Sequence, residues 1–561
     1  MAIRLDIPSR IWAAWVLQWC RAAGMRHLCL APGSRSTPLV LAAEALGFEH
    51  HLHWDERALG FYALGLSRAL GEPVGVVTTS GSAVANLVPA WVEAFQTGIP
   101  LIALTGDRPP ELHHCGANQS IPQADLLATC TRARLTLPPF DPEEDPDSLR
   151  DRVATVLQAL AEGPVHLNLM FREPFYPDAD DHQALPSGYP IAPPAWQPSP
   201  PIRPPMPAAL ETWLQQDLPL WVVALDGCRD AVDDILKLAP HARLLADIQS
   251  GLHGHPGVYA GLDRLLADEQ VQAGLEAPAR VLQLGSRPVS KRLTQWLARR
   301  PAGTLGIIAP DAHPTCIGHN AAWHWRVPVA SGVWALGPRI RTRKPDPLFV
   351  PPSRPAPPPA RTSDWTEIEW LQAVQARLLE RQAPVCWWVG NSLPIRLMDT
   401  FSLTRPAGGW DVRANRGASG IDGLIATLAG LARAEPDGPP VLALMGDLSA
   451  LHDLTSLHLL ARCTRPVTLV ILNNDGGGIF RWLPVPDDPV IAARYRCAHG
   501  LDFGQATAMM DLPWMALEPG PDAVDLVCET LADPGTRVIE LRTDADLSHA
   551  RWQARIPYIS N

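Results

Sequence analysis

Short apolar runs that end in glycine, serine or aspartate recur along the whole chain, and helical patterns lie between them. PVGVVTTSG, LWVVALDG and VTLVILNNDGGG are examples from the early, middle and late parts of the sequence. ERALGFYALGLSRAL is one of the intervening stretches, and its apolar residues recur with the period of a helix. This alternation predicts an α/β protein built from mostly parallel sheets flanked by helices.

Two proline-rich passages divide the alternation into three blocks. They are YPIAPPAWQPSPPIRPPMP at 189–207 and KPDPLFVPPSRPAPPPA at 344–360. Proline at this density interrupts helices and central strands, so we expect both passages to be extended linkers. We therefore predict three domains, at 1–185, 205–340 and 362–561, because 561 residues are too many for one hydrophobic core. The similar rhythm of the first and third blocks predicts a shared topology.

Charge and cysteine content exclude several classes of protein. The formal net charge of -11 argues against general nucleic-acid binding, which needs a basic surface. The ten cysteines show no CxxC pair and no zinc-ligand spacing, which favours reduced thiols in the cytoplasm. No segment has the length and apolarity of a membrane span, and the N-terminal residues, broken by Gln18 and Arg21, predict an amphipathic helix.

Two strand ends in the third block carry groups that suit a metal ion and a diphosphate. VLALM is followed by Gly446 and Asp447, and VTLVIL is followed by NNDGGG, which contains Asn474; 474 − 447 gives a separation of 27 residues. If the two strands are neighbours in a parallel sheet, both ends lie at the same edge. Carboxylate, amide and backbone carbonyl oxygens are the ligands that Mg²⁺ prefers, and glycines let backbone N–H groups reach a diphosphate. The alternative is a pair of unrelated tight turns.

The pair of motifs resembles the diphosphate-binding motif of thiamine-diphosphate enzymes. Its form, GDLSALHDL at 446–454 followed by NNDGGGIF at 473–480, resembles one branch, the 2-succinyl-5-enolpyruvyl-6-hydroxy-3-cyclohexene-1-carboxylate synthases (the MenD enzymes). Leu448 stands where a third glycine is usual in the superfamily, and Asp475 stands where the branch commonly has Asn. Further motifs that resemble this family follow its order: APGSRSTPLVLA, WDERALGFYALGLSRA, TTSGSAVANLVPAWVEA, LTGDRPPELHHCGANQSI, GSRPVSKRLTQWL, GNSLPIRLMD and NRGASGIDG.

The resemblance implies a transferase of the thiamine-diphosphate-dependent carboligase type, acting in menaquinone or phylloquinone biosynthesis. Its reaction would be decarboxylation of 2-oxoglutarate and 1,4-addition of the resulting succinyl semialdehyde carbanion to isochorismate. Residues 1–185 would bind the aminopyrimidine, 205–340 would be a central domain, and 362–561 would bind the diphosphate and Mg²⁺. The resemblance also implies a homodimer or homotetramer with active sites between subunits. The charge, the cysteines and the lack of a membrane-span pattern predict a cytoplasmic protein with no nucleic-acid or membrane partner.

Site residues follow from the same resemblance. The cofactor-binding set is Glu56, Thr79, Ser80, Gly81, Ser419, Ile421, Gly446, Asp447, Leu448, Ser449, Asn474, Gly476, Gly477, Gly478 and Ile479. Within that set, Asp447, Asn474 and Gly476 would bind Mg²⁺ or Mn²⁺. The catalytic set is Glu56, Arg35, Gln119 and Ile421. The substrate-binding set is Ser34, Arg35, Arg108, Gln119, Lys291, Arg292, Ser392, Arg396, Arg416, Ile479 and Phe480.

Ordinary structural roles compete with several of these assignments. A glutamate in the first turn of a helix commonly complements the helix dipole, whereas in the family Glu56 would hydrogen-bond the aminopyrimidine and act as a general acid or base. Scattered arginines are commonly surface residues, but their planar fork suits the two carboxylates of each implied substrate. Ile421, Ile479 and Phe480 would otherwise be core residues; in the family an aliphatic side chain at this place bends the cofactor.

The cations divide between the two substrates according to the resemblance. Arg396 and Arg416 would hold 2-oxoglutarate, and the other cations, Arg35, Arg108, Lys291 and Arg292, would hold isochorismate. Two alternatives remain open for the function. One is a thiamine-diphosphate enzyme that acts on a different 2-oxo acid, and the other is a non-catalytic nucleotide-binding or scaffolding relative that kept only the fold.

Overall fold

A computed structural model describes residues 7–175, 192–198, 204–311, 315–340, 344–348, 364–403, 409–482 and 489–556. By their contacts these residues form two compact units. The first unit takes in the described residues of 1–202 together with Asp422–Pro436 and Asp453–Arg462, and the second takes in the rest of the described chain. In the described part of the chain, no helix has the length and apolarity needed to cross a membrane.

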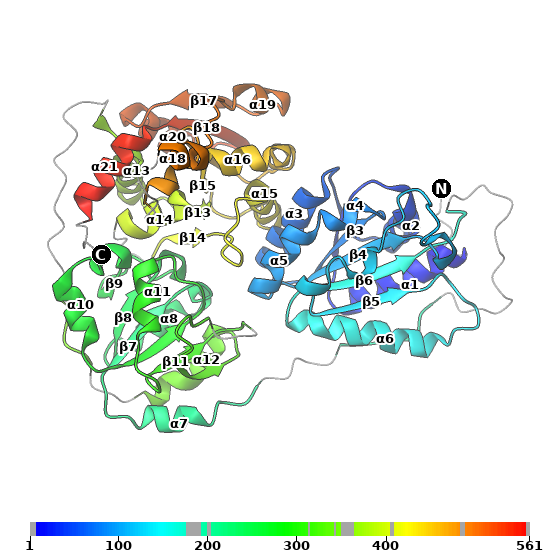
Figure 1. The fold of residues 1–561 in the computed structure, drawn as a ribbon, viewed down its shortest axis with the longest axis horizontal. Coiled ribbons are helices and arrows are strands. Elements are labelled where there is room, and N and C mark those ends of the chain that lie inside the picture. The colour runs from blue at the N-terminus through cyan, green and yellow to red at the C-terminus, as the bar shows by residue number, and fades with distance from the viewer. Residues whose placement is uncertain are drawn as a thin grey trace. The chain divides into compact units, whose positions relative to one another are not determined.

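The first unit is built on a parallel six-stranded sheet in the order β2-β1-β3-β4-β6-β5. Its strands are β1 (His27–Leu30), β2 (Glu49–Leu52), β3 (Val74–Thr78), β4 (Leu101–Asp107), β5 (Ala133–Leu137) and β6 (Val165–Met170). Its helices are α1 (Pro8–Ala22), α2 (Thr37–Leu46), α3 (Glu56–Leu70), α4 (Ser82–Ala85), α5 (Val88–Thr97) and α6 (Pro146–Gln158). Helices α1, α2 and α6 cover one face of the sheet, and α3 and α5 cover the other (Figure 1).

The N-terminal helix α1 differs from the amphipathic helix that the sequence predicts. It is buried on nearly all sides, and Arg21 and Ala22 at its end are its only fully exposed residues. Part of the first proline-rich passage accounts for this burial, because Trp19 donates a hydrogen bond to the carbonyl of Pro194 (3.0 Å) and Trp196 packs against the same core.

The second sheet is also parallel and six-stranded, in the order β12-β11-β10-β7-β8-β9. Its strands are β7 (Leu220–Ala224), β8 (Arg243–Ala246), β9 (Val258–Tyr259), β10 (Arg280–Leu284), β11 (Leu305–Ile308) and β12 (Ala321–Trp325). Helices α7 (Ala209–Leu214), α8 (Val232–Leu236) and α12 (Val329–Leu336) share the core on one face. Helices α9 (Leu262–Leu265), α10 (Glu269–Glu276) and α11 (Lys291–Ala298) share the core on the other.

The third sheet, in the second unit, has the order β14-β13-β15-β16-β18-β17. Its strands are β13 (Cys386–Val389), β14 (Asp411–Arg413), β15 (Val441–Gly446), β16 (Val467–Asn473), β17 (Trp514–Leu517) and β18 (Thr536–Arg542), and all its pairings are parallel. Counted from its own first strand, this order equals that of the first sheet, so the predicted shared topology is confirmed. The predicted α/β fold with three parallel sheets is confirmed as well.

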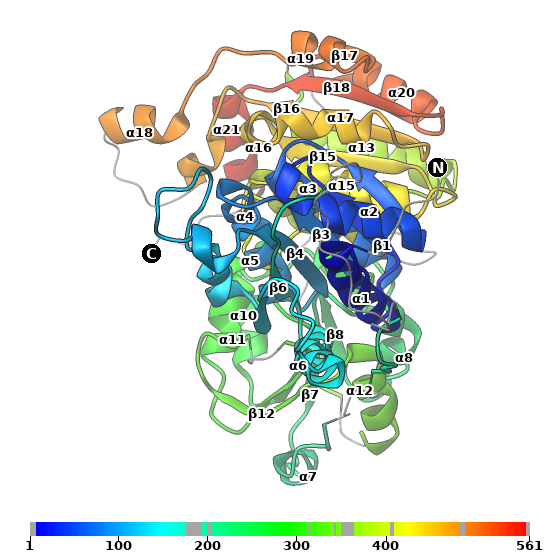
Figure 2. The same ribbon diagram turned by 90° about the vertical axis from the view of Figure 1, so that its right-hand side faces the viewer.

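Helices of the third block surround that sheet or join the first unit. Helices α13 (Glu367–Glu380), α14 (Leu393–Phe401), α20 (Pro521–Thr530) and α21 (Ala545–Arg555) share one core with the sheet. The remaining helices are α15 (Leu424–Ala434), α16 (Asp447–His452), α17 (Leu457–Leu460), α18 (Pro489–Arg496) and α19 (Gly504–Met509). Figure 2 shows α19 beside the edge strand β17. Helices α15 and α17 belong to the first unit, so the predicted boundaries of the three domains stay a prediction.

Within the first unit, α3 is fixed by its cap and by a close helix crossing. The Asp55 carboxylate accepts hydrogen bonds from the backbone N–H groups of Arg57 and Ala58, which starts the helix at Glu56. Helix α3 then packs against α15 at Gly65. A Cβ at this position would lie 2.0 Å from the carbonyl oxygen of Thr427. The crossing therefore requires glycine at this point.

Candidate functional site

The ends of β15 and β16 form the centre of the candidate site. These strands are neighbours, with Gly446 opposite Leu472, so Asp447 and Asn474 lie at the same edge of the sheet, as predicted. The Asp447 carboxylate is 2% exposed, and its Oδ2 accepts hydrogen bonds from the backbone N–H groups of Asn474 (3.1 Å) and Gly476 (2.9 Å). The glycine loop is therefore wrapped around this carboxylate.

The loop can take this path because it contains glycine. Gly476 has a φ of +119°, and a Cβ at this position would lie 2.0 Å from the carbonyl oxygen of Arg496. Gly477 donates its N–H to that carbonyl (2.5 Å). Any larger residue at 476 would have to move the backbone, which explains the glycine at this position.

Two polar groups here have the properties of metal ligands. The Asn474 Oδ1 atom is buried and has no hydrogen-bond donor among the described residues. Burial raises the pKa of Asp447, opposed by the N–H groups of Gly476 and Leu448. The unsatisfied amide oxygen costs free energy unless a donor or a cation binds it, and the Asp447 carboxylate lines the same cavity. The donor set thus fits a hard divalent cation such as Mg²⁺.

A cavity of about 330 Å³ opens directly over these groups. Its lining contains most of the predicted cofactor-binding residues of the third block, namely Ile421, Gly446, Asp447, Leu448, Ser449, Asn474, Gly476, Gly477, Gly478 and Ile479. Ser392 and Phe480, which were predicted to bind substrate, line it too. Ile421 and Phe480 are 39% and 36% exposed, so neither is a core residue. Ser419, also predicted to bind the cofactor, does not line this cavity. Its hydroxyl donates a hydrogen bond to the Arg416 carbonyl oxygen (3.4 Å).

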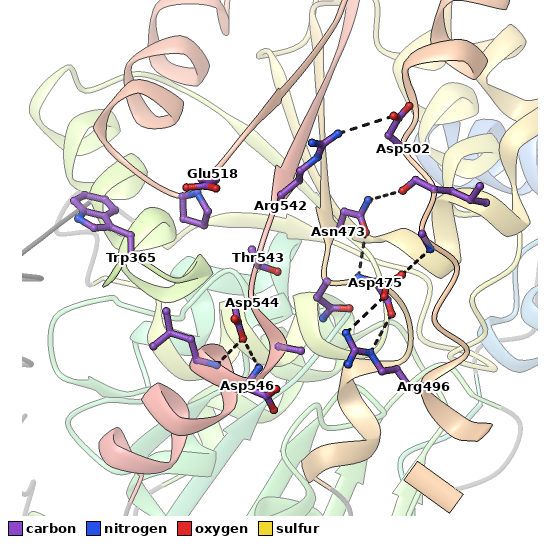
Figure 3. Close-up of a pocket in the computed structure, with 16 residues that line it drawn as sticks. Trp365, Asn473, Asp475, Arg496, Asp502, Glu518, Arg542, Thr543, Asp544 and Asp546 are labelled. Atoms are coloured by element: carbon purple, nitrogen blue, oxygen red, sulfur yellow. Dashed lines mark hydrogen bonds and ion pairs between the residues drawn. The ribbon is translucent and has the colours of Figure 1, made fainter. Parts of the chain in front are cut away.

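A second cavity, of about 750 Å³, lies beside the same turn, and seven of its sixteen lining residues are charged (Figure 3). Asp475 is in its wall and has a φ of +59°. Its Oδ1 accepts hydrogen bonds from the backbone N–H groups of His499 (2.9 Å) and Gly500 (2.8 Å), and the N–H donors of Gly500 and His499 lower the pKa of Asp475. An Asn side-chain oxygen could accept the same bonds. Asp475, in place of the Asn common in the branch, therefore keeps the hydrogen bonds between the glycine loop and the segment at His499 and Gly500.

Two of the predicted cations of the second unit, Arg396 and Arg416, lie near Ser392. Arg396 donates to the Ser392 carbonyl oxygen (2.6 Å), and Arg416 donates to Asn391 Oδ1 (2.8 Å). Burial, and then the positive charge of Arg416, lower the pKa of Arg396. Two mutually repelling guanidinium groups form a favourable place for a dianion. Arg292, by contrast, is paired with Asp263 (2.6 Å), and Lys291 begins α11.

In the first unit, the predicted catalytic glutamate begins α3. Glu56 is half-buried, and its Oε2 accepts a hydrogen bond from Asn86 Nδ2 (3.1 Å). Asn86 follows the short helix α4, five residues (86 − 81) after the predicted Thr79-Ser80-Gly81 segment. A carboxylate in this position can exchange a proton with a ligand placed next to it.

Ser80, Arg108 and Gln119 form one hydrogen-bonded group in the first unit. Arg108 donates to the Ser80 hydroxyl and to the Gln119 carbonyl oxygen (2.8 Å), and the Gln119 amide donates to the Ser80 carbonyl oxygen (2.7 Å). Gly81 follows with a φ of +86°, and a Cβ there would lie 2.8 Å from the Gln119 side chain. Thr79 contacts the loop at Gly33, where an added Cβ would collide with its side chain.

The Arg35 guanidinium, which was predicted to bind substrate, is already hydrogen-bonded within the protein. It donates to the Phe171 carbonyl oxygen (3.1 Å) and to Glu173 Oε1 (3.0 Å). Burial, and then the charge of Arg108, lower the pKa of Arg35. Ser34 precedes it at the start of a short 3-10 helix. To bind a substrate carboxylate, Arg35 would have to share its guanidinium with Glu173.

Three residues of these sites were not predicted. Asn391 donates to the carbonyl oxygens of Asn415 and Gly420 (2.8 Å each) and so fixes the loop that precedes Ile421. His499 places Nε2 3.3 Å from Asp447 Oδ2, and Asn86 contacts Glu56. An asparagine two residues after the end of strand β13 was a signal for Asn391. His499 carries no comparable signal, because it lies 52 residues after Asp447 (499 − 447) outside any strand end.

Family models of thiamine pyrophosphate enzymes match three segments of the chain. The N-terminal TPP binding domain matches residues 12–128, the middle domain matches 234–314, and the C-terminal TPP binding domain matches 404–541. The first and third matches contain Glu56 and Asp447, respectively. The order of the three matches agrees with the order of the three sheets.

Curated relatives are similar to the chain over almost its whole length. The chain is 38% identical to 2-succinyl-5-enolpyruvyl-6-hydroxy-3-cyclohexene-1-carboxylate synthase of Shewanella putrefaciens, over 95% of this chain and 94% of the relative. The enzyme of the same name from Shewanella oneidensis is 37% identical over the same shares. Among solved structures, benzoylformate decarboxylase from Polynucleobacter necessarius matches with a TM-score of 0.70 and 18% identity, over 96% of this chain and 99% of that one. That last likeness supports the fold alone.

Proposed function

Since the chain belongs to the family of 2-succinyl-5-enolpyruvyl-6-hydroxy-3-cyclohexene-1-carboxylate synthases, which is a family of thiamine-diphosphate-dependent enzymes, we infer that it joins 2-oxoglutarate to isochorismate. The product name contains a succinyl group, which is the four-carbon remainder of 2-oxoglutarate after loss of CO₂. The rest of the name describes the isochorismate skeleton after 1,4-addition. This reaction makes the protein a transferase of menaquinone or phylloquinone biosynthesis.

The observation that carries the proposal is the buried, unsatisfied Asn474 Oδ1 next to the Asp447 carboxylate. These two side chains and the Gly476 carbonyl would hold Mg²⁺ or Mn²⁺, with the remaining positions left for diphosphate oxygens and water. The N–H groups of the glycine loop would bind the diphosphate. Thiamine diphosphate, when bound, supplies a nucleophilic carbon and an electron sink, which amino-acid side chains lack.

Glu56 would hold and release a proton at the aminopyrimidine of the cofactor. Its hydrogen bond from Asn86 fixes one carboxylate oxygen and leaves the other available for that contact. Ile421 and Ile479 line the cavity beside the predicted metal ligands, where aliphatic side chains would orient the two rings of the cofactor. Gln119 and Arg35 would position the second substrate from the first unit.

The cations would bind the carboxylates of the two substrates. Arg396 and Arg416, close to Ser392 in the wall of the cavity, would hold 2-oxoglutarate. Arg108, Arg35, Lys291 and Arg292 would hold isochorismate, together with the hydrogen-bonding groups of Ser34 and Gln119. Pairing each carboxylate with a guanidinium fork fixes the orientation of the reacting carbon as well as binding the substrate.

We also propose a cytoplasmic homodimer or homotetramer with active sites between subunits. The half-exposed position of Glu56 fits a catalytic carboxylate that a second subunit would cover. All ten cysteines are free thiols, as a reducing compartment requires.

A product-identifying assay tests the reaction. Purified protein with thiamine diphosphate and Mg²⁺ should convert 2-oxoglutarate and isochorismate into the adduct, detected by mass spectrometry, with one CO₂ released per adduct. Omission of isochorismate should suppress product formation. Rapid CO₂ release without an adduct would instead identify a simple decarboxylase. Absence of Mg²⁺-dependent thiamine diphosphate binding in a calorimetric titration would identify a non-catalytic relative.

A further inference from the structure

Three side chains at the edge of the first sheet place metal-ligating atoms within 4.8 Å of one another. They are His27 on β1 and Glu49 and His51 on the edge strand β2. The parallel register pairs His27 with Glu49. Alternate residues of a strand point to the same face, so Glu49 and His51 share a face while His50, between them, points to the other.

Two of the three separations agree with ligands around one tetrahedral ion, and the third is below 4.8 Å. His27 Nδ1 lies 3.2 Å from His51 Nε2 and 3.6 Å from Glu49 Oε2. Zinc–nitrogen bonds of about 2.0–2.1 Å at a tetrahedral angle place neighbouring ligand atoms about 3.3–3.4 Å apart. Two imidazoles and one carboxylate are a donor set that binds Zn²⁺ and leaves a fourth position for water. Mg²⁺ prefers oxygen ligands and fits this set poorly.

The groups behind the ligands orient them toward a common point. Tyr62 Oη lies 3.1 Å from His51 Nδ1, which directs the other nitrogen of His51 toward His27. Glu49 Oε1 accepts a hydrogen bond from Arg433 (2.5 Å), so its Oε2 is the oxygen that faces His27. All these residues belong to the first unit.

Burial favours the neutral form of both imidazoles. Burial, followed by the charges of His27 and Arg433, lowers the pKa of His51 to about 3. Burial also lowers the pKa of His27, although the nearby Glu49 opposes it. Neutral imidazole is the ligating form, and a metal ion would replace the hydrogen bond that now joins the two rings.

We propose that His27, Glu49 and His51 form a Zn²⁺ site that joins the edge strand β2 to β1. Strand β2 leads through the capping residue Asp55 into α3, so zinc at this point would stabilise the segment that carries Glu56. The site is separate from the predicted ligands Asp447 and Asn474 and does not depend on the proposed reaction.

The test uses the full-length protein with saturating thiamine diphosphate and Mg²⁺, titrated with Zn²⁺ in a calorimeter. Zinc content after gel filtration is measured by mass spectrometry. Wild type should retain one more zinc ion per chain than either the His27→Asn or the Glu49→Gln variant. Added Zn²⁺ should raise the melting temperature of wild type. His50→Asn is the matched control, since it changes the adjacent histidine on the other face and should retain the ion. Tyr62→Phe should weaken zinc binding by about 10–100-fold.

Equal zinc content in wild type, His27→Asn and Glu49→Gln would overturn the proposal and identify a hydrogen-bonded cluster without metal. Co²⁺ gives a second readout. Wild type loaded with Co²⁺ should show the visible absorption bands of a tetrahedral site, and either ligand variant should lack them. Circular dichroism of each variant without added zinc establishes that it is folded, and if one variant is unfolded, the other decides the outcome.

Discussion

At the scale of single residues, the candidate site depends on a polar atom whose hydrogen bonds the protein itself leaves incomplete. Asn474 Oδ1 is buried without a donor among the described residues, whereas the nearly fully buried Asp447 carboxylate accepts three backbone hydrogen bonds. Left unpaired, the Asn474 oxygen would cost about 1–3 kcal/mol. This cost is removed when a cation binds, so the site stores binding energy for the metal and the diphosphate.

Glu56→Gln should leave thiamine diphosphate affinity nearly unchanged but lower turnover by about 10²–10⁴-fold, because the amide cannot exchange the proton. Affinity is measured by calorimetry and turnover by the adduct assay. Glu44→Gln is the control: Glu44 is an exposed glutamate of α2 that pairs with His50, and its loss should change neither quantity. Turnover within a few-fold of wild type in Glu56→Gln would remove Glu56 from the mechanism.

At the scale of elements, the glycine loop after β16 shows how backbone conformation shapes the site. Gly476→Ala should greatly weaken Mg²⁺-dependent cofactor binding, because the new methyl group would collide with the Arg496 carbonyl. Gly535→Ala is the matched control, since Gly535 also has a positive φ (+82°) but nothing lies within 4 Å of an added Cβ. Both variants carry backbone strain of about 1 kcal/mol, so a loss of binding confined to Gly476→Ala isolates the collision. Equal cofactor affinity in the two variants would contradict this account of the loop.

The start of α15 depends on a buried carboxylate that should make stability depend on pH. Asp453 accepts hydrogen bonds from the N–H groups of Ile425 and Ala426, and burial raises its pKa from 3.8 to about 6. Because the folded state binds this proton more tightly than the unfolded state, the stabilisation is present below pH 3.8 and is lost as the pH rises through about 6.

Asp453→Asn removes that titration. Between pH of about 4 and about 7, the stability of wild type relative to the variant should fall by about 3 kcal/mol. Melting temperatures of the two proteins across this range measure the difference. Asp437→Asn, at an exposed position, should keep a constant difference from wild type. A wild-type advantage that grows with pH would have the wrong sign for this explanation.

At the scale of the whole molecule, ligand binding to the third sheet should be visible in overall stability. With thiamine diphosphate present, adding EDTA should lower the melting temperature, because a ligand at about 100 times its Kd stabilises the folded state by about 2.7 kcal/mol. The shift should be absent without the cofactor. Asp447→Asn should show no Mg²⁺-dependent shift, while His452→Asn, at the far end of the same helix, should behave as wild type. An unchanged EDTA effect in Asp447→Asn would place the metal elsewhere.

Features that are local along the chain could be predicted from the amino-acid sequence. The alternation of apolar runs and helical patterns was enough for three parallel sheets, because strand and helix periods are properties of short segments. The same alternation predicted that Asp447 and Asn474 lie at one edge of a sheet, because the ends of neighbouring parallel strands lie at the same edge. The motifs around them were sufficient for the family and the cofactor.

Contacts between side chains of distant segments could not be predicted and are seen only in the folded protein. The pairing of Arg35 with Glu173, the contact of His499 with Asp447, and the meeting of His27, Glu49 and His51 depend on strand register and loop path. The burial of α1 depends on a proline-rich passage that returns to cover it. Such contacts join residues with no fixed spacing, so no period or motif in the linear sequence encodes them; they follow from the free energy of packing the whole chain.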